Sequence, residues 1–423
     1  MAQVEIPDQH QPRAGLVELV SRAITWRSLV IELVLLPFCA LWQTYRLGDG
    51  ILSLLVAPTA TTFFVALINL GLLRFTPRWA LSAGELGAIY TYLSIGCGIA
   101  SEWTYPVSVV MSWFTLHGNA SNRFYDNIAS YLPDWCTIKD PNLLKGYMDG
   151  AGIEYFYQLD HFVPWMVKFL PWGGFIFAMA FTMLCINVLM REEWTRRERL
   201  SFPILQVPLA IIGAGERRGA LRTKALWVGF AIGFFIDAYI GAARFIPSLP
   251  APNLRNIDMG TWFVNPPMNG LGFTPLSLYP FIIALSFFLP LDLSFSTWFF
   301  YLIRRAEQVI AIAYGQPGGV FLGMTAASQP PYLTQQSLGA WTTLFVLFLW
   351  LGREHLGHVW ENVRRGKPIQ EHMPFVSYRL TFILMLVGFG GLLVWSALLQ
   401  LPLLFMAIRS EEHTSELQSP NTI

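Results

Sequence analysis

Charged residues are scarce in this chain of 423 residues. Asp, Glu, Lys and Arg make up 13% of the sequence, against roughly 25% in an average soluble domain, and hydrophobic residues make up 54%. This shortage excludes a disordered chain and argues against a soluble enzyme. The 28 Lys and Arg residues nearly balance the 27 Asp and Glu residues, so no excess charge points to nucleic acid as a partner.

Cysteine is also sparse, and the motifs of several enzyme classes are missing. The four cysteines form no C-x-x-C pair, so neither a disulfide framework nor a zinc knuckle is indicated. The sequence has no G-x-S-x-G or H-E-x-x-H motif. The glycine-rich stretch 213–219 lacks the preceding strand of a dinucleotide site, and 315–319 lacks the Lys of a phosphate loop. We expect no cofactor and no metal.

Long apolar segments are what the chain has instead. A helix that crosses a bilayer needs about 20 mostly apolar residues. By this rule we predict helices near 28–45, 51–73, 84–117, 165–189, 225–243, 276–303, 338–352 and 380–408. The polar segment 1–27 contains no cleavable signal. The predicted fold class is therefore all-α, a polytopic integral membrane protein with about 8–10 transmembrane helices in 28–408, some broken or re-entrant, in the inner (plasma) membrane.

Two of the predicted segments are too long for one crossing. At about 1.5 Å per residue, 84–117 would be roughly 51 Å long. It contains Glu102 and Pro106 near its middle, and 276–303 contains Pro290 and Asp292 near its middle. We expect both to be broken helices or hairpins.

Positive residues in the loops predict the topology. The segments 190–224 and 353–379 carry the most Lys and Arg, eight and five, so both should be cytoplasmic. Three predicted helices separate them, which would place them on opposite sides. We favour a double crossing of 276–303 around Pro290 over re-entry of the stretch 309–337. Segment 1–27 is then cytoplasmic, and 118–164 forms an external cap.

Acidic residues at bilayer depth are the candidate functional residues, because an unpaired charge there is costly and commonly serves a transport pathway. Glu102 lies near the middle of its segment, and Asp237 lies near the middle of 225–243. We assign both as proton carriers or cation ligands. Gly229, Gly233 and Gly241 recur around Asp237 at every fourth position and should form a helix-packing face. The alternative is that these acids are protonated or paired structural groups.

Asp292 and Ser294 gain meaning if Pro290 breaks the helix. Either could then cap a half-helix whose N-terminus points at the bilayer midplane, where transporters bind substrate or ions. We assign both as substrate-lining residues, although a kinked helix with an ordinary cap would also explain them. Glu32 lies one turn into its helix and could reach the interface. Glu85 is close to a helix start, so stabilisation of the helix N-terminus explains it as well as function does.

Other polar residues carry weaker signals. His355 and His358 lie beside Glu354 on one helix face, but an amphipathic interfacial helix from Arg353 to Arg365 explains them better than a metal site does. The segment 118–164 holds several acids and a histidine without a recognisable spacing. They are Asp126, Asp134, Asp140, Asp149, Glu154, Asp160 and His161.

The C-terminal residues 409–423 differ abruptly from the rest. The chain has no charged residue from Leu380 to Ile408, and the string that begins at Arg409 matches the conceptual translation of a sequencing-library adapter. We expect this tail to be non-native and the natural protein to continue past Ile408.

The segment Glu198-Arg-Leu200-Ser-Phe202-Pro203 resembles an element of a family of uncharacterised bacterial membrane proteins that is distantly similar to oligopeptide transporters. The stretches 81–86, 131–135 and 336–340 are similar to that family too. The resemblance implies a proton-coupled secondary carrier of a small solute such as a peptide or metal chelate, which works in the lipid bilayer. The sequence leaves open a membrane-embedded enzyme for lipid or polyprenyl-linked substrates, and a structural or sensory subunit.

Overall fold

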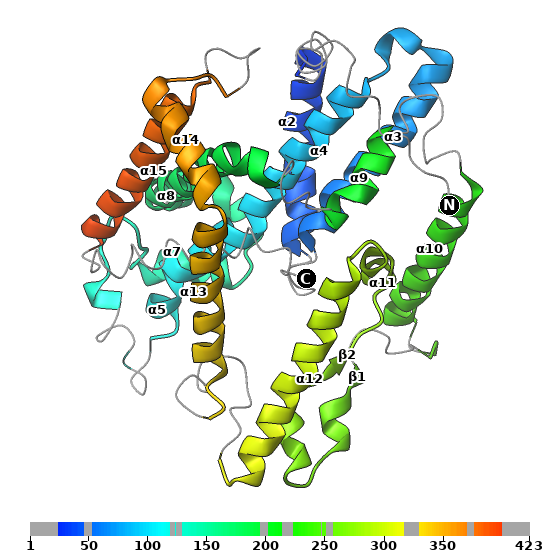
Figure 1. The fold of residues 1–423 in the computed structure, drawn as a ribbon, viewed down its shortest axis with the longest axis vertical. Helices are drawn as coiled ribbons and strands as arrows, with labels where there is room; N and C mark the ends of the chain where they lie inside the picture. Colours follow the sequence, from blue (N-terminus) through cyan, green and yellow to red (C-terminus); the bar gives the residue numbers. More distant parts are fainter. Residues whose placement is uncertain are drawn as a thin grey trace. The chain divides into compact units, whose positions relative to one another are not determined.

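The computed structural model describes residues 24–45, 53–118, 123, 129–194, 202–213, 223–246, 248–250, 257–316, 330–369 and 376–399. The chain forms two compact units. Figure 1 labels their helices and strands and colours them along the sequence. The first comprises Met1–Arg199, Ile211–Glu216 and Glu354–Ile423, and the second comprises Leu200–Ala210 and Arg217–Arg353. Each unit is described by itself.

Helices make up most of the described residues. In the first unit they are α2 (Trp26–Tyr45), α3 (Ser53–Phe75), α4 (Ala83–Gly98), α5 (Tyr105–Leu116), α7 (Pro141–Met148), α8 (Leu159–Glu192), α14 (Arg353–Arg365) and α15 (Tyr378–Leu398). Helix α9 (Pro203–Gly213) spans the border between the units, and the second unit holds α10 (Lys224–Phe245), α11 (Pro280–Ser286), α12 (Leu291–Ala313) and α13 (Leu333–Leu351). A short antiparallel pair, β1 (Ile257–Asp258) and β2 (Pro275–Leu276), is the one sheet among the described residues.

The predicted fold class is confirmed: the chain is an all-α polytopic membrane protein. Within the described part of the chain, α2, α3, α8, α10 and α15 are long and apolar enough to cross a membrane. Their lipid-facing character is clear in α2, where Leu33, Phe38 and Leu41 are 63%, 67% and 68% exposed while Glu32 and Gln43 are buried. A helix with its polar side chains inside and its apolar ones outside suits a bilayer, not water.

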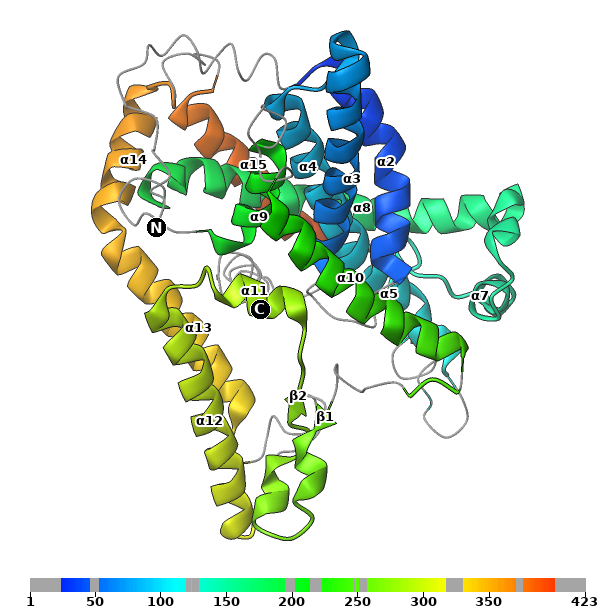
Figure 2. The same ribbon diagram turned by 90° about the vertical axis from the view of Figure 1, so that its right-hand side faces the viewer.

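Helices α2, α3 and α4 pack side by side (Figure 2). Arg27 of α2 contacts Glu85 of α4, and Cys39 of α2 contacts Cys97 of α4. Both pairs are 58 residues apart in sequence, so α2 and α4 run parallel. The chain must therefore return between them, and it does so through α3.

Helices α4 and α5 are joined by a π-helical segment, Ile99–Thr104. The backbone stays right-handed helical through Gly98, Ile99, Thr104 and Tyr105, so 83–116 is one continuous helix. The expectation of a broken helix or hairpin here is wrong. A proline ring clashes with the carbonyl four residues earlier, which for Pro106 is that of Glu102. The wider π turn accommodates this clash without ending the helix.

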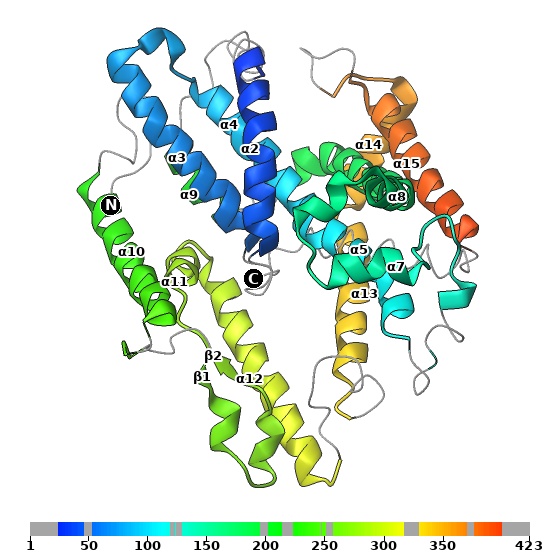
Figure 3. The same ribbon diagram turned by 180° about the vertical axis from the view of Figure 1, so that it is seen from behind.

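Helix α8 packs against α15, and Figure 3 shows the two helices beside each other from behind. Their contacts show that they run antiparallel. Leu189 clusters with Tyr378 at one end of the pair, and Trp172 contacts Trp395 near the other. Between them Gly388 lets the helices approach closely: a Cβ there would lie 2.3 Å from the Thr182 hydroxyl oxygen. Small residues at such crossings are the usual means by which membrane helices pack.

The predicted helix from Arg353 to Arg365 is confirmed as α14. Its buried residues Val359 and Val363 pack on Leu189 of α8 and Tyr378 of α15. The C-terminal end of α8 thus meets α14 and the start of α15. Trp135, from 118–164, contacts Trp395 at the other end of α15. Which side of the membrane each end faces stays a prediction from the loop charges.

The predicted helix break before Asp292 is confirmed in the second unit, because α11 ends at Ser286 and α12 starts after Pro290. The double crossing of 276–303 is not formed. Helix α11 has 7 residues, about 10 Å of helix at about 1.5 Å per residue, and a bilayer core is about 30 Å thick. Helix α12 instead continues to Ala313. Within it, the Arg305 guanidinium donates to the backbone carbonyls of Leu271 and Phe273.

Candidate functional site

Glu102 lies within the π-helical segment between α4 and α5. Its side chain is half-buried, and the adjacent Ser101 is fully buried and donates to the Cys97 carbonyl at 2.9 Å. Among the described residues Glu102 has no hydrogen-bond or ion-pair partner. A π turn displaces side chains from the regular helical register, and such turns are frequent at functional sites. The carboxyl group is therefore placed where it could bind a proton or a cation.

Glu32 is a second acid inside the first unit. The expectation that its side chain could reach the membrane interface is wrong. It is 4% exposed, two turns into α2, on the side that packs against α3 and α4. Ser28 and Cys39 are buried at helical spacing on the same stripe. Within the described structure Glu32 has neither an ion-pair nor a hydrogen-bond partner. Polar residues recur along α2 at helical spacing, and this spacing in the sequence could have indicated that Glu32 is buried.

Glu85 is held by partners at the start of α4. Ser82 and Glu85 form a reciprocal capping box, in which each side chain binds the other's backbone N–H at 3.2 and 2.8 Å. Arg27 donates to both carboxylate oxygens at 3.1 and 3.3 Å, and the Thr25 hydroxyl donates to one of them. This carboxylate, 2% exposed, therefore anchors the start of α2 to α4.

Asp237 and its glycines belong to the second unit. Asp237 lies mid-way along α10 and is exposed within that unit. A Cβ built on Gly229, Gly233 or Gly241 would meet no described atom within 4 Å. The structure thus leaves the glycine face open, and the assignment of these four residues stays a prediction.

Asp292 and Ser294 lie in the first turn of α12. Pro290 occupies the N-cap position, and no side chain caps the helix, so the expected capping by Asp292 or Ser294 is wrong. The Ser294 backbone N–H instead binds the Pro290 carbonyl at 3.0 Å. Asp292 is exposed and can stabilise the helix N-terminus by its charge alone. Their role as substrate-lining residues stays a prediction. Both residues belong to the second unit, whereas Glu102 belongs to the first.

His355 is a buried structural residue. Its Nε2 lies 3.0 Å from the Leu189 carbonyl oxygen and its Nδ1 lies 3.5 Å from a Glu193 carboxylate oxygen. These contacts attach α14 to the end of α8. No cluster of three or more metal-ligating side chains exists within the described ranges.

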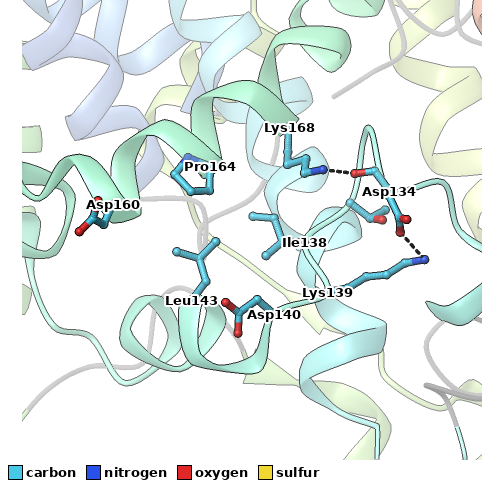
Figure 4. A pocket seen from close by; sticks show the side chains of 9 residues that line it. Asp134, Ile138, Lys139, Asp140, Leu143, Asp160, Pro164 and Lys168 are labelled. Carbon is cyan, nitrogen blue, oxygen red and sulfur yellow. Dashed lines mark hydrogen bonds and ion pairs between the residues drawn. The ribbon is translucent and has the colours of Figure 1, made fainter.

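The residues 134–168 form a pocket that sequence spacing did not reveal (Figure 4). We call it the loop pocket; its volume is about 310 Å³. It is lined by Asp134, Thr137, Ile138, Lys139, Asp140, Leu143, Asp160, Pro164 and Lys168. Three of the scattered acids therefore converge with two lysines, because the loop 134–140 folds back against the first three turns of α8. Asp126 lies outside the described residues.

Comparison with known proteins identifies one family. A family model described as "Family of unknown function (DUF6785)" matches residues 19–409. The match ends at the residue where the adapter-like string begins. No curated protein and no solved structure matches the chain.

Proposed function

Since the chain belongs to this DUF6785 family of unknown function, we propose that it is a secondary transporter of the inner (plasma) membrane. In this proposal protons drive the uptake or export of a small solute. Glu102 and Asp237 carry the coupling proton or cation, and Asp292 and Ser294 line the substrate path. The resemblance of 198–203 and 336–340 to oligopeptide-transporter-like proteins favours peptides or metal chelates as the solute.

The observation that carries this proposal is the π-helical placement of Glu102. A carboxylate without a partner at bilayer depth is costly, and such groups serve proton and ion pathways. Its segment lies between α4 and α5, in a continuous helix that packs against α2. A second acid, Glu32, is buried in that same bundle. The break at Pro290 adds a helix N-terminus of the kind that binds anionic groups in transporters.

The test is peptide uptake by vesicles that hold the full chain, driven by a pH gradient. Glu102→Gln keeps the size and hydrogen-bonding capacity of the side chain and removes its titration. We expect gradient-driven uptake to fall at least about tenfold, which is 1.4 kcal/mol, while exchange without a gradient persists. Glu154→Gln changes an exposed residue of the 3₁₀ turn Ile153–Tyr157, so it is the control and should behave as the wild type. Unchanged driven uptake in Glu102→Gln would remove Glu102 from the coupling step.

Asp237 is tested by two substitutions in the same assay. If it carries the coupling proton, Asp237→Asn abolishes gradient-driven uptake and preserves folding and exchange. If it is structural, Asp237→Asn is nearly silent, and Asp237→Leu destabilises the protein because it leaves polar partners unpaired. Wild-type uptake by the Asn variant would leave Glu102 as the remaining candidate.

A further inference from the structure

We propose that the loop pocket binds a small zwitterion, a short peptide with free termini, through a basic end and an acidic end. This inference rests on the proposed transport function, adds a binding site to it and narrows the solute to a short peptide. The pocket lies in the segment predicted to face the outside, so it would be the first contact of the solute with the protein.

The basic end of the pocket has two lysines around one aspartate. Lys139 forms an ion pair with Asp134 at 2.7 Å and donates to the Ser130 carbonyl at 3.3 Å. Lys168 of α8 donates to the backbone carbonyl of Asp134. Two positive charges face one carboxylate, so this end carries a net positive charge and can receive a peptide carboxylate. The Lys139 ammonium lowers the pKa of Asp134 through its hydrogen bond and its charge, so the ion pair persists at mildly acidic pH.

The acidic end has two carboxylates, those of Asp140 and Asp160. Asp140 caps α7 by accepting the Asn142 backbone N–H at 2.9 Å. Asp160 lies in the first turn of α8, on the opposite side of the pocket from Asp134 (Figure 4). Neither acid forms an ion pair with a described residue. This end is negative and can receive a peptide ammonium group.

The scaffold between the two ends is fixed before any ligand binds. The Ile138 backbone N–H donates to the Met111 carbonyl of α5 at 3.1 Å, and the Trp172 indole donates to the Cys136 carbonyl at 2.8 Å. Ile138 and Cys136 are 2% and 1% exposed. A preformed site avoids the entropic cost of ordering a loop on binding.

The size and the floor of the pocket also suit a short peptide. Its volume of about 310 Å³ lies at the lower end of the usual range for small-ligand pockets, about 300–1,000 Å³. Ile138, Leu143 and Pro164 provide apolar lining between the charged ends. A side chain of the peptide could pack there while its termini contact the two ends.

The experiment measures equilibrium binding of the dipeptide Ala-Ala to the full chain in lipid nanodiscs by calorimetry. The same peptide with an acetylated N-terminus and an amidated C-terminus lacks both charges and should bind at least about tenfold more weakly. Lys168→Gln and Asp140→Asn should each weaken Ala-Ala about tenfold, and Asn preserves the cap of α7. Asp149→Asn, at the exposed C-terminal end of α7, should leave binding unchanged.

The inference would be overturned by equal binding of the blocked peptide, or by equal weakening by Asp149→Asn. Binding of Ca²⁺ through Asp140 and Asp160 without binding of Ala-Ala would also overturn it, in favour of a cation site. The assay separates this inference from the transport function. Coupled uptake without peptide binding at the loop pocket would reject the proposed binding site and leave the transport function standing. Peptide binding without uptake would reject the transport function and leave the binding site standing.

Discussion

At the scale of single residues, three carboxyl groups of one helical bundle differ in what surrounds them. Glu85 has Arg27, Thr25 and Ser82 as partners, whereas Glu32 and Glu102 have none among the described residues. A buried carboxylate with a full set of donors stabilises the fold, and one without donors is costly and is retained for another reason. The presence of hydrogen-bond partners therefore distinguishes Glu85, a structural acid, from the candidate functional acids Glu32 and Glu102.

Glu85→Gln should destabilise the protein by about 1–3 kcal/mol, because a hydrogen bond to a charged group is worth about that much. Gln keeps the capping box, so the loss belongs to the contacts with Arg27 and Thr25. The measurement is the free energy of unfolding in detergent micelles. Glu361→Gln is the control: it removes an exposed ion pair with Arg365, and its effect should be below about 0.5 kcal/mol. Equal effects of the two variants would contradict the anchoring role of Glu85.

At the scale of elements, two helix pairs of the first unit lead to testable predictions, α8 with α15 and α2 with α4. The first pair depends on a glycine at the contact. Gly388 faces Thr182 and Ala178 of α8, while two residues later a Cβ on Gly390 would meet nothing within 4 Å. A glycine is thus required for close packing at position 388 of α15 and not at position 390.

Gly388→Val should destabilise the unit by about 1–3 kcal/mol, the usual cost of overpacking. The new side chain would collide with the Thr182 hydroxyl, which is itself bonded to the Ala178 carbonyl at 2.7 Å. Gly390→Val introduces the same β-branched residue into open space and serves as the matched control. The measurement is the melting temperature in micelles, and similar losses in both variants would argue against the α8–α15 contact.

The parallel packing of α2 and α4 brings the sulfur atoms of Cys39 and Cys97 to 3.1 Å. Treatment with copper phenanthroline, which removes two electrons and two protons, should join them by a bond of about 2.05 Å. Mass spectrometry of alkylated peptides would detect the linked pair. Cys136 and Cys185 are buried singly and should stay reduced. Free Cys39 and Cys97 after oxidation, with both alkylated once the protein is unfolded, would show that α2 and α4 do not pack this way.

At the scale of the whole molecule, the arginine-rich helix α14 and the aromatic cluster around Trp395 lie at opposite ends of the α8–α15 pair. With the loop charges, this arrangement predicts a cytoplasmic α14 and an external segment 118–164.

Labelling with a membrane-impermeant maleimide checks this topology. A cysteine introduced by Glu154→Cys should react in intact cells, and one introduced by His358→Cys should react only after lysis, because both positions are exposed. The native Cys136 is 1% exposed, and burial raises the pKa of its thiol. Since the thiolate is the reacting form, Cys136 should stay unlabelled at neutral pH and gain reactivity only at higher pH than the introduced cysteines. Labelling of His358→Cys in intact cells would invert the topology.

The sequence by itself determined the membrane class, the position of most helices, the helix Arg353–Arg365 and the break at Pro290. These follow from composition, hydrophobic periodicity and proline chemistry, which act over a few neighbouring residues. The continuity of the helix through Glu102 was not predictable in this way, because a π turn and a break both relieve the clash made by Pro106.

Only the tertiary structure decided which polar groups have partners. Glu85 contacts Arg27, which is 58 residues away in the sequence, and Cys39 contacts Cys97 at the same separation. The loop pocket joins residues 134–143 to the first turns of α8. No local pattern specifies such contacts, because they depend on the direction and rotation of whole helices. Glu32 illustrates the reason: one residue's shift in helical position would turn it from the bundle interior towards lipid, and only the packing of α2 against α3 and α4 determines its side.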